Sequence, residues 1–145
     1  MTKIRSAARK SSLSEDNHLV ATAMRGHWYV ACRSQQLRRR PIERVVLGER
    51  LALFRGKDGK IGALTNRCAH RNLALSRGRV ESDGLSCTYH GWTYDSTGDC
   101  VRVPAACEAS VRQGRPRVPA YSVREKQGLV WVYLSEKGEK PKSEP

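Results

Sequence analysis

The sequence predicts an all-β fold made of small antiparallel sheets. The chain has 145 residues, enough for one hydrophobic core but not for two. It contains many short runs rich in Val, Leu, Ile and aromatic residues, and turn-forming residues separate these runs. A helical pattern is confined to a short stretch near the N-terminus. Short strands, tight turns and little helix together favour packed antiparallel sheets.

Residues 1–25 are expected to form a basic tail followed by a short helix. Residues 1–14 contain no acid and are rich in Arg, Lys and Ser, a composition typical of a basic tail and also of an organelle transit peptide. Ser12 and Glu15 have the spacing of a capping box, so a helix is expected from there to about residue 24. No apolar segment of the kind found in secretory signals follows the basic residues.

The strand candidates fall between residues 26 and 134, and turn signals separate them. Asp58-Gly59 lies between two apolar runs and is typical of a hairpin turn. Residues 95–98 and 126–128 carry similar turn signals. The polar residues 135–145 contain two prolines and are expected to form a loose tail. The candidate strands are Trp28–Cys32, Arg44–Leu47, Arg50–Phe54, Ile61–Leu64, Leu85–Cys87, Thr93–Tyr94, Val101–Val103, Tyr121–Arg124 and Leu129–Tyr133.

A net charge of +13 is the most unusual bulk property of the chain. Strongly basic domains often bind nucleic acid. This chain has no recognised nucleic-acid-binding motif and no long basic helix, so nucleic acid is not an expected partner. The longest apolar run, Leu129–Leu134, is far too short to span a bilayer, so no membrane partner is expected either.

Four potential metal ligands stand in two alternating pairs. Cys68 and His70 form the first pair, and sixteen residues later Cys87 and His90 form the second. In a Rieske [2Fe–2S] centre, two thiolates hold one iron and two imidazoles hold the other. Two loops that each offer one Cys and one His can clamp both irons from both sides. The spacing therefore predicts a Rieske-type [2Fe–2S] cluster as the cofactor.

Zinc is the main alternative for these four residues. Structural zinc sites also use two Cys and two His, but a Cys pair usually precedes a His pair, with typically two to four residues inside the first pair. Here the order alternates, and one residue separates Cys68 from His70. The other cysteines show no ligand spacing and are expected to be reduced thiols, as in a cytoplasmic protein; they are Cys32, Cys100 and Cys107.

The sequence around the ligands resembles the Rieske domain of Rieske non-haem iron oxygenase large subunits and of Rieske-type ferredoxins. The first loop begins Cys68-Ala-His70-Arg, and the second reads Cys87-Thr-Tyr-His90-Gly-Trp-Thr-Tyr-Asp. The resemblance covers about residues 26–134. It implies the Rieske fold, with a cluster-binding subdomain of about residues 66–105 inserted into a basal sandwich or barrel. It also implies that ligand nitrogens are Nδ1 atoms and that six further residues surround the cluster: Arg71, Tyr89, Gly91, Trp92, Tyr94 and Pro104.

The resemblance also implies a low reduction potential. High-potential Rieske proteins of respiratory complexes have a disulfide between the loops, and here Leu73 and Tyr89 occupy the matching neighbourhood. Those proteins also place a Ser hydroxyl where this chain has Trp92. Because fewer hydrogen bonds to sulfur stabilise the added charge less, the potential is expected near the bottom of the Rieske range of about −150 to +300 mV. Tyr94 is either a remaining donor or a packed aromatic residue.

Several other residues have structural expectations. Gly91 is expected to relieve crowding after His90, and Gly78 to occupy a turn with positive φ. Pro104 is either part of a rigid flap over the cluster or an ordinary loop proline. The tryptophans are expected in the core; they are Trp28, Trp92 and Trp131.

The expected function is one-electron transfer to a non-haem iron oxygenase or a similar enzyme. Such oxygenases react with O2 at a separate iron held by two His and one carboxylate. Only His18 and His27 remain outside the pattern, and they show no ligand spacing, so no catalytic residues are expected in this chain. It is expected to be a component of an oxidoreductase system.

Three forms of this function are open. The chain length favours a free-standing ferredoxin-like carrier. The Tyr89 to Trp92 segment and the N-terminal extension favour the electron-accepting domain of a ring-hydroxylating or demethylating oxygenase α subunit. A redox-sensing regulator is a remote third form.

The expected partners are an electron-donating reductase and an electron-accepting oxygenase or other redox protein. Four arginines flank the first ligand pair without any acid between the first and the last. A positive rim of this kind would steer a partner with an acidic docking face. The alternative is a basic surface that is simply solvated. The four residues are Arg67, Arg71, Arg77 and Arg79.

Overall fold

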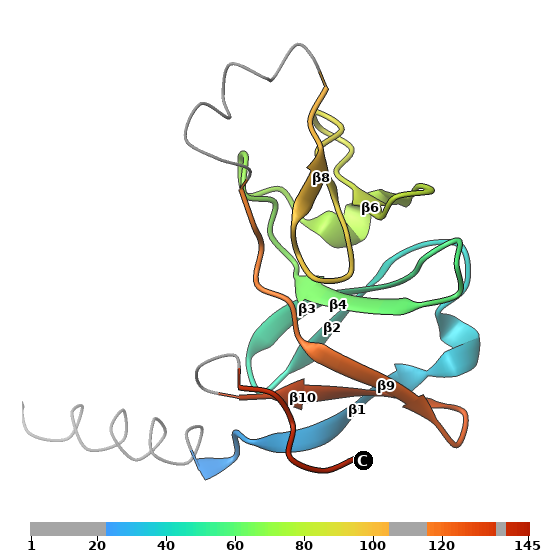
Figure 1. Ribbon diagram of the computed structural model, residues 1–145, viewed down its shortest axis with the longest axis vertical. Coiled ribbons are helices and arrows are strands. Elements are labelled where there is room, and N and C mark those ends of the chain that lie inside the picture. The colour runs from blue at the N-terminus through green and yellow to red at the C-terminus, as the bar shows by residue number, and fades with distance from the viewer. Residues whose placement is uncertain (1–22, 105–115, 136–138) are drawn as a thin grey trace, which may run out of the picture.

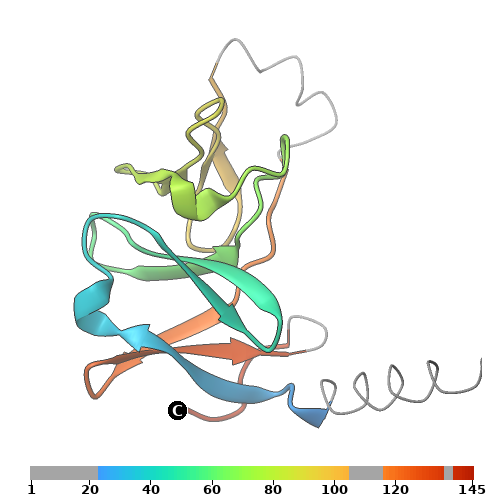
Figure 2. The same ribbon diagram turned by 180° about the vertical axis from the view of Figure 1, so that it is seen from behind.

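A computed structural model describes residues 23–104, 116–135 and 139–145. Within these residues the chain forms short strands in three antiparallel sheets, with the orders β1-β10-β9, β2-β3-β4 and β5-β6-β7-β8. The third sheet lies at one end of the long axis, above the other two (Figures 1 and 2). The elements are β1 (His27–Arg33), η1 (Ser34–Gln36), β2 (Ile42–Val46), β3 (Glu49–Arg55), β4 (Ile61–Thr65), η2 (Leu75–Arg77), β5 (Arg79–Val80), β6 (Leu85–Ser86), β7 (Thr93–Tyr94), β8 (Cys100–Arg102), β9 (Ser122–Lys126) and β10 (Leu129–Leu134).

Strands β3 and β4 of the middle sheet are buried on both faces because they carry continuous apolar runs. On β3, Leu51 and Leu53 pack against β1-β10-β9, whereas Ala52 and Phe54 belong to the core beneath the third sheet. Alternate side chains of a strand point to opposite faces, so a run of four apolar residues supplies two cores. The fold therefore has three layers, and the middle layer is the platform on which the third sheet stands.

Strand β10 is the central strand of its sheet, with one face on the core and the other on the surface. Its residues Val130, Val132 and Leu134 are fully buried, whereas the residues between them are partly exposed. This period of two is typical of a strand with one face on the core. It places the aromatic side chains of β10 on the outer surface of the molecule.

The predicted turns are present. Gly59 has φ 82° in the turn between β3 and β4. Asp95 accepts hydrogen bonds from the backbone N–H groups of Thr97 and Asp99 in the turn before β8. Gln127 and Gly128 both have positive φ between β9 and β10, as a two-residue hairpin of type I′ requires. All three turns therefore form for the chemical reasons that the sequence suggests.

The all-β expectation is confirmed, and most strand bounds agree with the sequence pattern to within one or two residues. Strand β5 has only two residues and gives no sequence signal. The expected helix between residues 13 and 24 lies almost entirely outside the described residues, as do Ser12, Glu15 and His18. No helix in the described part of the chain is long and apolar enough to cross a membrane.

The expectation for Gly78 is wrong. Its backbone is extended, with φ −76° and ψ −161°. A Cβ atom at this position would lie 2.2 Å from the carbonyl oxygen of Ser86 and 2.8 Å from that of Leu75. Glycine is needed here because the end of η2 lies against β6, not because of a left-handed turn.

Two of the three tryptophans are not core residues. Trp92 is 3% exposed, but Trp28 and Trp131 are only half-buried. Because Trp28 is opposite Tyr133 and Val30 is opposite Trp131 in the register, these four side chains share the outer face of the sheet.

The C-terminal residues 139–145 also differ from the expectation of a loose tail. Trp28 Nε1 donates a 2.7 Å hydrogen bond to the carbonyl oxygen of Ser143. Arg124 and Glu144 form a 3.1 Å ion pair. In Figure 1 this segment crosses the β1-β10-β9 sheet. The tail therefore covers part of the aromatic outer face.

The turn at Gly98 generates a prediction about stability. Gly98 has φ +87°, and a Cβ atom there would lie 2.0 Å from the carbonyl oxygen of Val118. We expect Gly98→Ala to lower the free energy of unfolding by about 3 kcal/mol or more, because backbone strain and a backbone clash add. Urea unfolding of the purified protein measures the change.

Gly59→Ala is the matched control. Gly59 has a similar φ of +82°, but no heavy atom lies within 4 Å of a Cβ there. It should cost only the conformational term, about 1 kcal/mol. Equal losses in the two variants would contradict the clash at Val118.

Candidate metal centre

The two ligand loops have the same backbone turn although their sequences differ. In each, the N–H of the Cys donates to the carbonyl five residues later, and the carbonyl of the Cys accepts from the N–H four residues later. Loop 1, residues 68–73, follows β4, and loop 2, residues 87–92, is the hairpin between β6 and β7. The bonds are Cys68 N to Leu73 O and Asn72 N to Cys68 O in loop 1, and Cys87 N to Trp92 O and Gly91 N to Cys87 O in loop 2, all of 2.8–3.0 Å.

The fourth position after each Cys has positive φ. Asn72 has φ 58° in loop 1, and Gly91 has φ 70° in loop 2. Asn and Gly are the residues that tolerate this conformation best. A Cβ atom at Gly91 would also lie 3.1 Å from Cγ of Pro104, so the expected crowding at Gly91 is present. Pro104 lies directly against loop 2.

The two thiols of the pattern are buried and adjacent. Cys68 is 1% exposed and Cys87 is 2% exposed. A hydrogen bond from the Cys87 thiol lowers the pKa of Cys68 to about 5, against the opposing effect of burial. The same bond raises the pKa of Cys87, because that thiol holds the shared proton. Both side chains can therefore serve one metal ion as neighbouring sulfur donors once that proton is lost.

Tyr94 joins the two loops. It stands on β7 directly after loop 2, and its hydroxyl lies 3.3 Å from Cys68 Sγ in loop 1. The N–H of Ala69 donates to the same hydroxyl oxygen at 3.2 Å. Burial and the contact with Cys68 raise the pKa of this hydroxyl, so it keeps its proton and can donate to sulfur. Tyr94 is thus both a packed aromatic residue and a donor.

The two imidazoles lie beside each other. The ring centroids of His70 and His90 are 4.6 Å apart, and His70 stacks on Trp92 with 4.5 Å between centroids and 3° between planes. His90 Nδ1 is buried and has no hydrogen-bond partner among the described residues. A buried nitrogen without a partner costs about 1–3 kcal/mol, which a bound metal ion would remove.

These side chains line a small, partly open pocket. Two sulfur and two nitrogen donors converge on it, and this is the donor set of a Rieske cluster. Among the described residues, no three His, Cys, Asp or Glu side chains are grouped so that they could hold a single metal ion. A two-iron cluster does not need such a group, because each iron takes only two donors from the protein. The residues present fit a [2Fe–2S] cluster. The pocket is lined by Cys68, His70, Arg71, Leu73, Cys87, Tyr89, His90 and Trp92.

Asn66 supports loop 1, and sequence reasoning missed it. It is 7% exposed and stands two residues before Cys68, where the loop begins. Its Nδ2 donates to Glu43 at 2.7 Å, and its Oδ1 accepts from the N–H of Ser76 at 2.7 Å. Glu43 is far away in the sequence, so no local pattern could have indicated this contact.

The predicted basic rim is present but partly neutralised. All four of its arginines are exposed. Arg67 Nε donates to Asn72 at 2.7 Å, which ties this side chain to loop 1. Arg79 forms a 2.6 Å ion pair with Glu81, so its charge is largely compensated. Arg71 lines the pocket itself.

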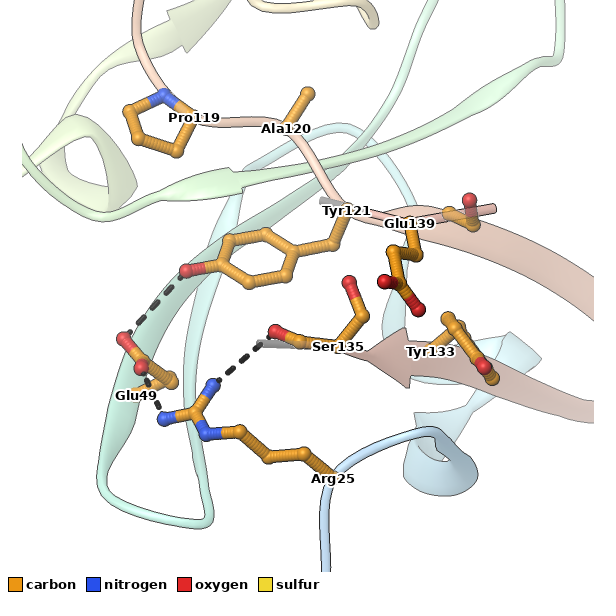
Figure 3. A pocket seen from close by; sticks show the side chains of 9 residues that line it. Arg25, Glu49, Pro119, Ala120, Tyr121, Tyr133, Ser135 and Glu139 are labelled. Atoms are coloured by element: carbon orange, nitrogen blue, oxygen red, sulfur yellow. Dashed lines mark hydrogen bonds and ion pairs between the residues drawn. The ribbon is translucent and has the colours of Figure 1, made fainter. Parts of the chain in front are cut away.

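A second hollow lies at the base, away from the ligand loops (Figure 3). Arg25 forms a 2.7 Å ion pair with Glu49 and donates to the carbonyl oxygen of Ser135 at 3.4 Å. The hydroxyl of Tyr121 donates to Glu49 at 3.5 Å (Figure 3). The Arg25 and Glu49 charges are paired with each other, so these contacts join the start of β1 to the strands around it.

Sulfur and imidazole donors on two matched loops, at one end of a small β domain, define an iron–sulfur electron-transfer protein. The comparison with known families is specific: the model of the Rieske [2Fe-2S] domain matches residues 27–122. The chain therefore belongs to the Rieske [2Fe–2S] domain family. Its cofactor is the Rieske [2Fe–2S] cluster, and its function is one-electron transfer through that cluster.

Curated relatives are oxygenase subunits. The chain is 40% identical over 113 residues to the 3-chlorobenzoate-3,4-dioxygenase oxygenase subunit of Comamonas testosteroni, covering 77% of this chain and 26% of that protein. It is 39% identical over 118 residues to the phenoxybenzoate dioxygenase subunit alpha of Ectopseudomonas oleovorans, covering 81% and 29%. The chain thus spans less than a third of the length of these relatives.

A solved structure shows the same fold. Dicamba monooxygenase bound to dicamba matches with a TM-score of 0.72 and 34% identity, over 83% of this chain and 36% of that chain. The Rieske resemblance, the fold class and the cofactor predicted from the sequence are confirmed. The roles of single residues stay predictions.

The Tyr94 contact generates a prediction about the reduction potential. Tyr94→Phe removes a hydroxyl placed to donate to the Cys68 sulfur, so the charge added on reduction should be less stabilised. We expect the potential to fall by on the order of 60 mV, the equivalent of one hydrogen bond. Spectroelectrochemical titration of the cluster-loaded protein measures it.

Tyr121→Phe is the control for this experiment. Tyr121 is also a partly buried tyrosine, but its hydroxyl contacts Thr65 and Glu49 in the base. Its potential should equal that of the unaltered protein. The same fall in both variants would mean that loss of packing, not loss of the donor, lowers the potential.

Proposed function

We propose that Cys68 and Cys87 bind one iron of the cluster and that His70 and His90 bind the other. The buried, unpartnered Nδ1 of His90 beside a pair of adjacent thiols carries this proposal. The matched turns of the two loops support it, because they bring one sulfur and one imidazole from each loop to the same pocket. Zinc is less suited, since a single ion would need all four donors around one point.

The residues around the pocket perform three tasks in electron transfer. When bound, the cluster supplies a centre that gains and loses one electron. The buried cysteines keep water from the sulfur side, and Tyr94 donates to a ligand sulfur. The half-buried rings of His70 and His90 reach the surface, so their outer edges offer the shortest path to a partner. Tyr89 is 57% exposed, and the centroid of its ring lies 3.9 Å from that of His90. It therefore belongs to the same contact surface.

We further propose that the cluster has a low potential within the Rieske range. Leu73 and Tyr89 leave the loops without a disulfide between them. Tyr94 supplies a donor to sulfur, but no Ser hydroxyl follows Gly91. The charge added on reduction is therefore stabilised by fewer hydroxyl groups than in high-potential Rieske proteins.

The electron is proposed to go to the mononuclear iron of an oxygenase. Similarity to the oxygenase subunits of two dioxygenases favours an electron-accepting domain of an oxygenase α subunit. A separate ferredoxin-like carrier is the second candidate, because the domain carries a complete set of cluster ligands by itself. A reductase is the proposed donor, and the cytoplasm, where thiols remain reduced, is the proposed location.

Removing one imidazole tests the ligand assignment and the function together. We expect His70→Ala and His90→Ala to lose at least 90% of the acid-labile sulfide, because three ligands do not hold a two-iron cluster. Even the loss of a residue that only supports a ligand weakens metal binding about 10-fold or more. In an assay with a reductase and an oxygenase that lacks its own Rieske centre, product formation should be lost in parallel.

His27→Ala is the matched control, because His27 is an exposed histidine on β1. It should keep its sulfide and support the same product formation as the unaltered chain. Full sulfide in His90→Ala would exclude His90 as a ligand. An intact, reducible cluster that yields no product with any pairing would exclude the separate carrier.

The basic rim generates a prediction about the partner. We propose that it attracts an acidic docking face, and that Arg71→Glu with Arg77→Glu slows electron transfer from an acidic plant-type ferredoxin by about tenfold at low salt. Stopped-flow reduction measures the rate. Near 0.5 M salt the difference should shrink, because the Debye length falls to about 4 Å.

Arg39→Glu with Arg40→Glu is the control for this pair. These residues are exposed in the connection between η1 and β2, outside the ligand loops, and the net charge changes by the same amount. An equal decrease in rate would show that total charge, not the rim, steers the partner.

A further inference from the structure

Trp92 carries a second buried polar group that lacks a partner beside the ligands. The indole is 3% exposed, and its Nε1–H has no hydrogen-bond acceptor among the described residues. Buried indole N–H groups usually have an acceptor. Trp92 lines the same pocket as the four ligand candidates. The residue that carries this unpartnered donor therefore lines the pocket in which the cluster sulfides are expected.

The ring is held where it is and cannot turn to water. One face of the indole stacks on His70, with 4.5 Å between centroids and 3° between planes. The backbone carbonyl of Trp92 closes loop 2 by accepting from Cys87 N at 2.8 Å. The rest of the side chain packs in the core with Leu75, Leu85 and Tyr94.

A buried water is a poor alternative as the acceptor. Such a water needs two to four polar partners, typically about three. The other polar side chains at the pocket are the thiols and imidazoles proposed as ligands, together with the exposed Arg71 and Tyr89. An inorganic sulfide needs no donors of its own and carries negative charge.

We propose that Trp92 Nε1–H donates a hydrogen bond to an inorganic sulfide of the cluster and raises the reduction potential. This inference rests on the proposed ligand set. The sequence indicates only that a Ser hydroxyl is missing at this position; the structure assigns an indole N–H to the same task. The chain would then have two side-chain donors to sulfur, Tyr94 for a ligand thiolate and Trp92 for a sulfide.

The effect follows from charge. Reduction adds one electron and therefore one negative charge, and a donor to sulfur is stronger after that addition than before. Removal of the donor should make reduction less favourable. For one hydrogen bond to a charged group we expect about a tenfold decrease in the equilibrium constant for reduction, which is about 59 mV for one electron.

The first experiment compares reduction potentials of cluster-loaded variants. Trp92→Phe keeps an aromatic ring for the stack on His70 but has no N–H. Its potential should fall, whereas Trp131→Phe, on the outer face of the base, should leave the potential unchanged. An unaltered potential in Trp92→Phe with full acid-labile sulfide would overturn the donor role.

The second experiment needs no substitution at the site. In the reduced, cluster-loaded protein with ¹⁵N in its indole nitrogens, pulsed electron paramagnetic resonance should detect a ¹⁵N coupling to the cluster. Trp28→Phe and Trp131→Phe should both retain the coupling, which assigns it to Trp92. An intact cluster without any indole coupling overturns the inference alone. A wild-type protein that binds no iron and sulfide would overturn the ligand set, and the inference with it.

Discussion

The site depends on a group of buried polar atoms that a bound cluster would satisfy. Two adjacent thiols line one small pocket together with an imidazole nitrogen and an indole N–H that have no hydrogen-bond partner among the described residues. Leaving such groups buried without partners destabilises a fold by about 1–3 kcal/mol each. Bonds to iron and hydrogen bonds to sulfide would satisfy these buried groups. Binding of the cluster is therefore expected to stabilise the third sheet, as in other small metal-binding domains.

The base of the molecule makes this burial possible. Strands β3 and β4 supply side chains to two cores. The third sheet therefore packs on a middle layer whose other face packs against β1-β10-β9. Asn66 ties loop 1 to Glu43 on this platform, and Tyr94 ties loop 1 to loop 2. The proposed ligands are thus held by strands and short turns, and little movement is expected on reduction. Such rigidity favours fast electron transfer, because the protein needs little rearrangement when the charge changes.

The surface near the ligands and the surface of the base suit different contacts. Around the histidines lie exposed arginines and Tyr89, a mixture that favours a transient, charge-steered partner. The outer face of β1-β10-β9 carries Trp28, Trp131 and Tyr133, and the C-terminal residues already cover part of it. In relatives roughly three times longer, further chain is available to pack against the Rieske domain. The first surface is therefore the one proposed for electron transfer.

The sequence by itself determined the all-β class, most strand positions, the turns and the Cys/His pattern, because each of these depends on neighbours along the chain. Only the tertiary structure decided which groups from distant parts of the chain meet. The role of Asn66, the contact from Tyr94 to Cys68 and the stack of Trp92 on His70 join residues from different elements, and no local pattern encodes such distances. Gly78 shows the same limit: the sequence indicates a turn glycine, whereas its real constraint is the approach of β6. Likewise, Trp28 and Trp131 have core-like chemistry, but the pairing of β1 with β10 places them outside.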